Sequence, residues 1–444
     1  MFEKGVIFVP ISNKVAREMS TIDFFSAEAQ SKRKFAFSIM PKPVGPICNL
    51  DCKYCYYLEK ENIYQDKEGK LKAFMMPEDL LEQFIKSYIE AQPDELPEIV
   101  FTWHGGEPTL AGLPYFERII ALQKKHAKHQ AIKNNIQTNG MYIDEAWAKF
   151  LHDHDWLVGL SIDGPKELHD PLRPTKGGKS SFDGAMRAIQ LFNRYKVEFN
   201  TLTVVNSLNG QHPLQVYRFL KAIGSRYMQF IPIQEVEATN NDTLVSPLYK
   251  GETAVTPESI KPEDYGKFLI AIFDEWVQQD IGRYFVQQFD VSLSSYMGYA
   301  PALCIFSKYC GTALAMEHNG DLFACDHYVY PEFKLGNIKE EKIDKMVSSP
   351  AQIKFGTDKF DSLAEDCLNC QHLKMCYGEC PKNRFAKTDA GESIAYLCNG
   401  YFDFYEHITP YLARMKKLLD QQRAPAEIMY EIAKEKKKAR KAKK

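Results

Sequence analysis

Three cysteines, Cys48, Cys52 and Cys55, fall within eight residues in the spacing C-x3-C-x2-C. Cysteine thiolates are the usual ligands of a [4Fe–4S] cluster, which has four irons. Three closely spaced cysteines can therefore hold one cluster and leave its fourth iron open to bind another molecule. Zinc is the alternative, but a structural zinc site usually has four ligands from two paired knuckles. The spacing thus favours an iron–sulfur cluster.

Eight more cysteines follow in the second half of the chain, after a long cysteine-free stretch. They are Cys304, Cys310, Cys325, Cys367, Cys370, Cys376, Cys380 and Cys398. They divide naturally into two sets of four, which could hold two zinc ions or two [4Fe–4S] clusters, and the spacing alone leaves both alternatives open. The apolar run at residues 5–11 is too short for an export signal and is broken by proline. In a reducing compartment such cysteines are metal ligands more often than disulfides.

The composition is that of a soluble globular protein. The chain has 444 residues, 45% of them hydrophobic, and a formal net charge of −2. This length allows two or three domains with their own cores. No apolar run is long enough to cross a bilayer, and the overall charge gives no indication of nucleic-acid binding. We therefore expect a cytoplasmic protein with no membrane or nucleic-acid partner, and a solvated, frayed end at the lysine-rich residues 434–444.

Strands and helices alternate through the first half of the chain, and they must position the motifs. Strands are expected at 35–40, 99–103, 132–137, 157–162, 197–205 and 227–233, and helices near 113–129, 144–153, 182–195 and 212–223. This alternation predicts parallel β/α units that form a full or partial barrel. Barrel active sites lie at the C-terminal ends of the strands. The cysteine loop and the sequences GGEP, QTNG and SIDG all follow strands, so we expect them to meet at one mouth.

The rest of the chain is less regular. Residues 1–34 show no clear periodicity and form an N-terminal lead. Residues 234–262 are polar and contain several prolines, which predicts a long loop or linker, followed by a helix at 263–279. Residues 313–325 predict a β-hairpin with a tight turn at Asn319-Gly320. A helical stretch rich in aromatic residues follows Cys398.

The motifs at the strand ends have both a functional and a plainer interpretation. Gly105 and Gly106 allow the backbone to approach a ligand closely, and Glu107 can accept hydrogen bonds from an ammonium group. The alternative is an ordinary strand-to-helix turn. Arg173 offers a fixed positive fork that suits a carboxylate, or it forms a surface ion pair. Three further polar residues are expected at the same mouth: Tyr57, Gln137 and Asn139.

The cysteine motif followed by GGEP resembles the radical S-adenosylmethionine (SAM) enzymes, in which the open iron binds the amino and carboxylate groups of SAM. The resemblance implies that Glu107 meets the methionyl amine and that Ser161 contacts the carboxylate or ribose. The cofactor-binding residues that it implies are Tyr57, His104, Gly105, Gly106, Glu107, Ser161 and Arg173. His104 is a departure, because glutamine is expected there and touches SAM, although a histidine can also donate or accept a hydrogen bond.

The later cysteines resemble the SPASM extension of this superfamily, which carries two auxiliary [4Fe–4S] clusters. The resemblance implies interleaved ligands. Cys304, Cys310, Cys325 and Cys380 would hold the first cluster, and Cys367, Cys370, Cys376 and Cys398 the second. With all eight positions filled, neither auxiliary cluster has an open iron, which favours electron transfer over substrate ligation. The cofactors implied are thus three [4Fe–4S] clusters and SAM.

The fold that follows is α/β. It consists of a partial (β/α)6 TIM-like radical SAM barrel, followed by a small cysteine-rich SPASM domain with a β-hairpin and C-terminal helices. The expected divisions are an N-terminal lead at 1–34, the radical SAM core at 35–280, the SPASM domain at 281–405, and a C-terminal helix with a basic tail at 406–444.

Several stretches narrow the resemblance to the anaerobic sulfatase-maturating enzymes, over about residues 38–405. They are WHGGEPTLAG at 103–112, QTNG at 137–140, VGLSIDGPKELH at 158–169, VEFN at 197–200 and CDHY at 325–328. Such enzymes oxidise a cysteine or serine of an unfolded or nascent sulfatase to Cα-formylglycine. The resemblance implies that the first cluster cleaves SAM to a 5′-deoxyadenosyl radical, which takes a hydrogen atom from the target Cβ.

The remaining proton and electron need acceptors. The resemblance places the catalytic base at Asp326, directly after Cys325, whereas the plainer interpretation is a carboxylate that caps the turn after the hairpin. The auxiliary clusters would take the electron, and an external donor such as flavodoxin or ferredoxin would reduce the enzyme.

Two alternatives for the function remain open. One is a radical SAM/SPASM maturase of another peptide, forming a thioether or carbon–carbon crosslink, and the other is a non-catalytic zinc scaffold.

Overall fold

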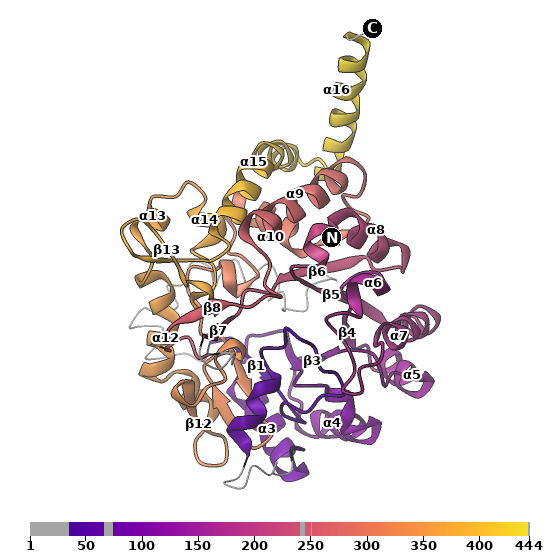
Figure 1. Cartoon of the computed structure of the whole chain (residues 1–444). Coiled ribbons are helices and arrows are strands. Elements are labelled where there is room, and N and C mark those ends of the chain that lie inside the picture. Colours follow the sequence, from indigo (N-terminus) through magenta and orange to yellow (C-terminus); the bar gives the residue numbers. More distant parts are fainter. Residues whose placement is uncertain (1–34, 66–73, 240–244, 250, 443–444) are drawn as a thin grey trace.

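The computed structural model describes residues 35–65, 74–239, 245–249 and 251–442, so the predicted lead at 1–34 lies outside the described residues. Its central feature is a parallel sheet in the order β2-β3-β4-β5-β6-β9, with helices around it (Figure 1). The strands are β2 Glu98–Trp103, β3 Ala131–Thr138, β4 Leu157–Ser161, β5 Glu198–Val205, β6 Tyr227–Pro232 and β9 Phe285–Val286. The predicted α/β class is therefore confirmed, and the functional motifs follow β2, β3 and β4.

Amphipathic helices cover this sheet. They are α3 Glu78–Ala91, α4 Leu113–His126, α5 Glu145–Asp153, α7 Phe182–Tyr195, α8 Pro213–Ala222 and α9 Pro262–Gln279, with a short α6 at Lys166–His169. Helix α7 buries Ala185, Ala188 and Phe192 along one face, the pattern of a helix that packs on a core. The Asp144 side chain caps α5 by accepting a hydrogen bond from the Trp147 backbone N–H at 2.9 Å.

Strand β1 (Ser38–Pro41) precedes the cysteine loop, as predicted, but it pairs outside the six-stranded sheet. It runs parallel to β10 (Ala313–Met316) in a second sheet that continues through β11 (Asp321–Phe323) and β12 (Lys334–Asn337). Strands β10 and β11 are antiparallel, and Gly320 at φ +92° turns the chain between them, which confirms the predicted hairpin. The pairing of β1 with β10 brings the two cysteine-bearing halves of the chain together.

The stretch 234–262, predicted to be a loop, contains a small antiparallel pair. Strands β7 (Val236–Ala238) and β8 (Thr253–Val255) pair over three residues each. The prediction was wrong here because both strands are short and β8 is exposed, so they lack a clear hydrophobic alternation.

The C-terminal region consists mainly of helices. They are α10 Gln287–Tyr296, α11 Ile343–Val347, α12 Pro350–Asp361, α13 Glu365–Leu368, α14 Leu373–Cys376, α15 Cys398–Asp420 and α16 Ile428–Ala442, with a two-residue ladder of β13 (Ala386–Lys387) and β14 (Ser393–Ile394). Aromatic residues join this region to the barrel. Tyr401 of α15 meets Tyr265 of α9 with ring centroids 5.4 Å apart, and Phe404 stacks on Phe289 of α10 at 5.8 Å. The predicted aromatic helix after Cys398 is confirmed.

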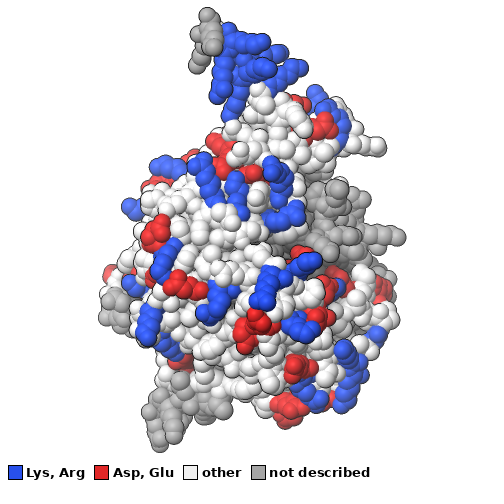
Figure 2. All heavy atoms as spheres, turned by 90° about the vertical axis from the view of Figure 1, so that its right-hand side faces the viewer, with Lys and Arg blue, Asp and Glu red and all other residues white. Residues whose placement is uncertain are grey.

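Helix α16 extends away from the body of the molecule (Figure 1). Lysine and arginine side chains crowd its outer end (Figure 2). The end of the chain was predicted to fray, whereas α16 continues to Ala442, with residues 443–444 outside the described part. Its side chains are exposed from Lys434 onward, as predicted. Within the described residues, every helix is too short or too polar to cross a membrane.

Candidate active site

The cysteine loop lies after β1 and is held by backbone contacts to GGEP. The N–H groups of Gly106 and Glu107 donate to the carbonyls of Gly45 and Ile47 at 2.8 and 2.9 Å. The Gly106 backbone approaches so closely that a Cβ atom there would lie 2.0 Å from the Ile47 carbonyl oxygen. Only glycine fits such a contact, so the two glycines of GGEP dock the cysteine loop.

The three cysteines of this loop are close together and largely buried from water. Burial is the main cause that raises the pKa of both Cys48 and Cys52 to about 12, and the neighbouring thiols add to the increase. None of the three forms a disulfide. Buried thiols of this kind stay protonated near neutral pH unless a cation binds them. The loop therefore has the donor set of a cluster site, and these residues fit a [4Fe–4S] cluster.

Glu107 connects the ends of two strands. Its Oε1 accepts hydrogen bonds from the backbone N–H of Thr109 at 3.0 Å and from the Thr138 hydroxyl at 2.7 Å, and its Oε2 accepts from the Asn139 N–H at 2.8 Å. The side chain is buried, and burial raises its pKa. Because Oε1 is saturated by protein donors, only Oε2 retains capacity for the ammonium group expected from the sequence.

Asn139 and Ser161 also lie at this mouth. The Asn139 side-chain amide is 3.8 Å from the Cys48 sulfur and donates to Asn49 Oδ1 at 2.8 Å. Ser161 is the last residue of β4, directly before Ile162 and Asp163. The structure thus brings the QTNG and SIDG motifs to the strand ends that face the cysteine loop, as the sequence predicted.

Arg173 is in a buried ion pair. Its Nε donates to Asp163 Oδ2 at 2.9 Å, and the Tyr54 hydroxyl donates to the same oxygen. Burial by itself lowers the pKa of Arg173, but Asp163 outweighs it and holds that pKa well above its usual value. Arg173 also lowers the pKa of the Cys52 thiol, against the larger effect of burial. The surface ion pair considered as an alternative is therefore wrong, and the guanidinium lies beside the cluster loop.

Asp326, from the second cysteine region, also reaches this loop. The Tyr56 hydroxyl donates to its Oδ2 at 2.5 Å, and the Lys42 ammonium forms an ion pair with its Oδ1. Burial alone would raise the pKa of Asp326, but Lys42 opposes it most strongly and the net pKa lies well below the usual range. The carboxylate is therefore ionised near neutral pH. The turn-capping alternative has little support, because no helix or turn N–H bonds to this side chain among the described residues.

Lys42 is fully buried, which is rare for lysine. Its ammonium lies 3.4 Å from the centre of the Tyr57 ring, and the Tyr57 hydroxyl donates to the buried carboxylate of Glu317. Tyr57 thus contacts Lys42 and Glu317 rather than presenting a free hydroxyl at the mouth. The sequence analysis missed Lys42, Tyr56 and Glu317. Lys42 had one signal, because it lies between two prolines directly before the cysteine loop.

His104 directly follows β2, and both Asp326 and Lys42 affect its pKa. Burial lowers its pKa to about 4, with opposing effects from Asp326 and Gln137. The ring is therefore neutral near pH 7. Its Nδ1 is buried and has no hydrogen-bond partner among the described residues.

The eight later cysteines group into the two predicted sets. Electrostatic coupling of the thiols joins Cys304, Cys310, Cys325 and Cys380, and separately Cys367, Cys370, Cys376 and Cys398. Burial is the largest cause that raises the pKa of Cys310 and Cys376 to about 12 and that of Cys398 to about 11. Among the described residues, no three His, Cys, Asp or Glu side chains converge as they would around a single metal ion.

Two buried cations accompany these thiols, and the sequence analysis missed both. Lys359 donates to the backbone carbonyls of Cys304 and Ile305 at 2.9 and 2.8 Å, and it lowers the pKa of the Cys304 thiol against the effect of burial. Arg384 donates to the carbonyls of Gly378 and Lys359, both at 2.8 Å. These cations offset the negative charge that thiolate-bound clusters bring into the interior.

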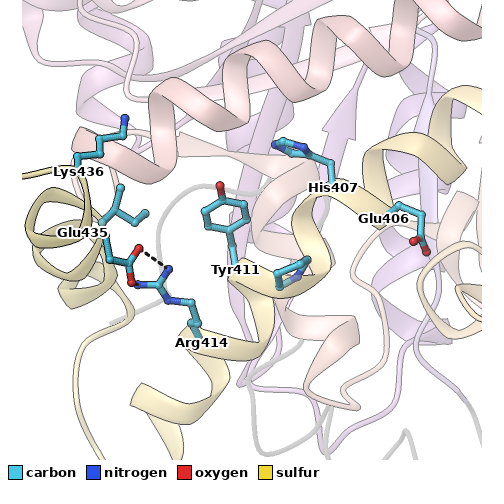
Figure 3. A pocket seen from close by; sticks show the side chains of 8 residues that line it. Glu406, His407, Tyr411, Arg414, Glu435 and Lys436 are labelled. Carbon is cyan, nitrogen blue, oxygen red and sulfur yellow. Dashed lines mark hydrogen bonds and ion pairs between the residues drawn. The ribbon is translucent and has the colours of Figure 1, made fainter. Parts of the chain in front are cut away.

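A shallow pocket lies beside α9, α15 and α16 (Figure 3). Its charged groups already have partners. Arg414 pairs with Glu431 and Glu435, each at 3.0 Å, and His407 bonds to Asp274 at 2.7 Å. The pocket is therefore a packing groove at the base of α16 and contributes no chemistry to the barrel mouth.

Comparisons with known proteins agree with this site. A model of the radical SAM superfamily matches residues 43–220, and one of the SPASM iron–sulfur cluster-binding domain matches 304–371. The chain is 46% identical over 394 residues to a serine-type anaerobic sulfatase-maturating enzyme of Bacteroides thetaiotaomicron, covering 88% of this chain and 94% of that protein. It is 35% identical over 378 residues to a cysteine-type enzyme of Clostridium perfringens, covering 84% and 97%. The solved structure of native anSMEcpe with bound AdoMet and the Cp18Cys peptide superposes with a TM-score of 0.74 at 33% identity, covering 86% of this chain and 99% of that one.

Proposed function

The chain belongs to the anaerobic sulfatase-maturating enzymes of the radical SAM superfamily, and on that basis we propose that it oxidises one cysteine or serine of a sulfatase polypeptide to Cα-formylglycine. It is a radical SAM enzyme with iron–sulfur clusters, so the zinc-scaffold alternative is wrong. Its relatives include both serine-type and cysteine-type enzymes, so family membership leaves the target residue open. The anSMEcpe structure contains a bound peptide, which supports a peptide segment as substrate.

One contact supports the proposal most strongly. Asp326 of the second cysteine region and Tyr56 of the first are in direct contact, at 2.5 Å between Oδ2 and the hydroxyl oxygen. Tyr56 directly follows Cys55, and Asp326 directly follows Cys325. A carboxylate thus lies between two candidate cluster loops. This position suits a base that takes a proton from a substrate undergoing oxidation there.

The residues proposed to hold the cofactors are those of the barrel mouth. Cys48, Cys52 and Cys55 would bind the cluster that accepts SAM, and His104, Gly105, Gly106, Glu107 and Ser161 would surround SAM. Arg173 would balance charge beside Cys52, because its side chain pairs with Asp163. The two later sets of four cysteines would hold the auxiliary clusters. When bound, this assembly supplies a hydrogen-atom acceptor for the target Cβ and an acceptor for one electron.

Asp326 supplies the proton acceptor in this scheme. The target side chain loses one hydrogen atom, one proton and one electron, which together convert a CH2–OH group to an aldehyde. The Lys42 ammonium keeps Asp326 ionised, as a proton acceptor must be, and the same ion pair makes this carboxylate a weaker base than a free aspartate. Its low pKa also means that the proton passes on readily to water. A cysteine target would give a thioaldehyde, which water then converts to the same aldehyde with loss of the sulfur.

The proposed divisions of the chain are the core at 35–280, the SPASM domain at 281–405 and a C-terminal helix with a basic tail at 406–444. Two elements cross these boundaries, because β9 at Phe285–Val286 pairs with β6 in the core sheet and α15 runs from Cys398 to Asp420. The β1–β10 pairing joins the first two of these regions and holds Asp326 at the mouth of the core. An external electron donor such as flavodoxin or ferredoxin would reduce the enzyme.

The experiment that tests this function is anaerobic incubation of the reconstituted enzyme with SAM, a reductant and a peptide that carries a sulfatase motif. Mass spectrometry should find a serine peptide lighter by two hydrogen atoms, or a cysteine peptide with its sulfur replaced by oxygen and two hydrogens lost. A thioether or carbon–carbon crosslink within the peptide would instead support a maturase of another class.

A further inference from the structure

Helix α12 packs its buried face against the backbone beside one group of cysteines. We call this group the first auxiliary set, and its members are Cys304, Cys310, Cys325 and Cys380. The buried residues of the helix recur at helical spacing and are Gln352, Gly356 and Lys359. The Gly356 carbonyl accepts from the Cys310 N–H at 3.2 Å. Gln352 Nε2 donates at 3.0 Å to the carbonyl of Ala324, which directly precedes the third cysteine of the set. One face of α12 therefore holds two of the cysteine-bearing segments.

Lys359, on the same face, holds a third segment. Its side chain is fully buried, and its Nζ donates to the carbonyls of Cys304 and Ile305 at 2.9 and 2.8 Å. It also donates to the carbonyl of Ser307. An ammonium group has three N–H donors, whereas a neutral amine has only two. Three carbonyl acceptors need all three protons, so Lys359 carries a positive charge in the folded protein.

The charge of Lys359 forms no ion pair with a carboxylate among the described residues, because its three acceptors are neutral carbonyls. The buried carboxylate of Glu379 interacts with it electrostatically. The hydrogen bonds to Glu379, however, come from Gln234 at 3.1 Å and Asn383 at 2.9 Å. A buried cation without an anion is unfavourable, so the region is balanced when negative charge is added beside Lys359.

The first auxiliary set supplies negative charge when its thiolates bind a cluster. Burial raises the pKa of the Cys304 and Cys310 thiols, and Lys359 opposes this increase most strongly. The reduction potential of a cluster depends on its net charge, on nearby hydrogen bonds and on its exposure to solvent. Reduction adds one negative charge to the cluster, and a buried cation beside it stabilises the more negative state. The buried position of Lys359 therefore favours reduction of a cluster in this set.

We infer that Lys359 raises the reduction potential of the cluster bound by the first auxiliary set, which makes this cluster the acceptor of the electron that the target residue loses. After the hydrogen atom has left, the substrate radical gives one electron to this cluster and one proton to Asp326. Asp326 directly follows Cys325 of the same set, so the two acceptors adjoin in the sequence. Lys359 is a positioning residue, because it acts on the cluster and contacts no substrate. Its effect on the potential is independent of the substrate, whereas the electron transfer rests on the proposed function.

The test is an anaerobic redox titration of the reconstituted holoenzyme, in which electron paramagnetic resonance follows each reduced cluster. Lys359→Gln removes the charge and keeps a donor for the carbonyls, whereas Lys359→Arg keeps the charge. Lys354→Gln is the matched control, because Lys354 is an exposed lysine of the same helix. In Lys359→Gln the equilibrium constant for reducing one cluster should fall about tenfold, a shift of about 59 mV to more negative potential. The potentials of the other clusters should not change, and Lys359→Arg and Lys354→Gln should match the wild type.

Two cysteine variants identify the cluster that shifts. Its signal should be absent from Cys380→Ala and present in Cys376→Ala, because Cys380 belongs to the first auxiliary set and Cys376 does not. With SAM and a target peptide, the ratio of formylglycine to 5′-deoxyadenosine should also be lower in Lys359→Gln than in the wild type.

Iron and labile sulfide equal to those of the wild type show that a variant is fully loaded, and Lys359→Met is titrated instead if Lys359→Gln does not load. Unchanged potentials in the loaded variant, or a shift in the signal that Cys376→Ala lacks, would overturn the inference. Loss of the cluster from all three Lys359 variants would also overturn it, since lysine would then only hold the fold. If the wild type forms no formylglycine, the electron-accepting role fails with the proposed function, while the titration still decides whether Lys359 sets the potential.

Discussion

The Tyr56 hydroxyl donates to Asp326 Oδ2 at 2.5 Å although the two residues are 270 positions apart in the sequence. Tyr56 belongs to the first cysteine loop and Asp326 follows the β10–β11 hairpin of the second region. The parallel pairing of β1 with β10 aligns these two segments, with Met40 opposite Ala315 and Pro41 opposite Met316. A contact between the two halves of the chain thus builds the proposed reaction site.

The ion pair between Lys42 and Asp326 leads to the first prediction. Lys42→Met should destabilise the fold by about 3 kcal/mol or more, because it leaves a buried carboxylate without its cation. The double variant Lys42→Met with Asp326→Asn should recover most of that loss, since the charge is removed from both sides. Anaerobic denaturant unfolding of the two variants and the wild type measures the difference. Equal stability of the single and double variants would show that the pair contributes little.

The pH dependence of this pair has a defined sign. The pKa of Asp326 is lower in the folded state than in the unfolded state, so its contribution to stability is present above the unfolded pKa of about 4 and is lost below it. Lys42→Met should therefore have a lower free energy of unfolding than the wild type at pH 5 to 7.

The second prediction concerns the grouping of the eleven cysteines into three, four and four. Replacing Cys48, Cys52 and Cys55 by alanine should remove about one third of the iron and labile sulfide and abolish SAM cleavage. Cys380→Ala and Cys376→Ala should each remove about one third by disturbing different auxiliary clusters, and their losses should add in the double variant. Loss of all iron in the triple variant would indicate one cooperative metal core instead.

The third prediction concerns the docking of GGEP against the cysteine loop. In Gly106→Ala the new Cβ would lie 2.0 Å from the Ile47 carbonyl oxygen, so the loop must move. We expect loss of the SAM-binding cluster, with about two thirds of the iron retained. Gly177→Ala is the matched control, because the nearest atom to its Cβ is 4.0 Å away. Full iron content in Gly106→Ala would mean that the loop tolerates the displacement.

The fourth prediction concerns His169, a buried histidine whose Nδ1 accepts from the Asp163 N–H at 3.2 Å and whose Nε2 bonds Ser181 at 2.9 Å. Burial lowers its pKa to about 4. The histidine of the unfolded chain titrates near 6.5. As the pH falls from 6.5 towards 4, His169 therefore lowers the free energy of unfolding of the protein, by about 2 kcal/mol at pH 5. His169→Gln should show a pH 7-to-5 loss that is smaller by about this amount in anaerobic unfolding, whereas the exposed His129→Gln should match the wild type. Identical losses in all three proteins would contradict the assignment.

Much of the fold followed from local patterns. Helix α7 occupies the predicted residues 182–195 because its buried residues repeat with helical spacing, and the β10–β11 hairpin follows from Asn319-Gly320. Helix α3 was not assigned, although Leu80, Leu81 and Phe84 line its buried face. The pairing of β1 with β10 was not predicted, because the sequence of a strand does not indicate which distant strand it pairs with.

The candidate site also contains residues that the sequence predicted and residues that only the structure revealed. The cysteine spacing and the GGEP and CDHY motifs consist of residues adjacent in the sequence, so they could be recognised from the sequence alone. The burial of Lys42, Lys359 and Arg384 could not, because these residue types are usually exposed and only the folded chain reveals the negative groups around them. Arg173 was recognised, but its partner Asp163 became evident only in three dimensions.

Hydrogen transfer from the target residue tests the central claim most directly. The wild type and Asp326→Asn are each incubated anaerobically with SAM, a reductant and a serine peptide deuterated at Cβ, with the exposed Asp420→Asn as control. The wild type should place deuterium in 5′-deoxyadenosine and form formylglycine. Asp326→Asn should still transfer deuterium, but formylglycine formation should fall by about 10²- to 10⁴-fold. Unlabelled 5′-deoxyadenosine from the wild type, or formylglycine formed by Asp326→Asn at the wild-type rate, would contradict the account.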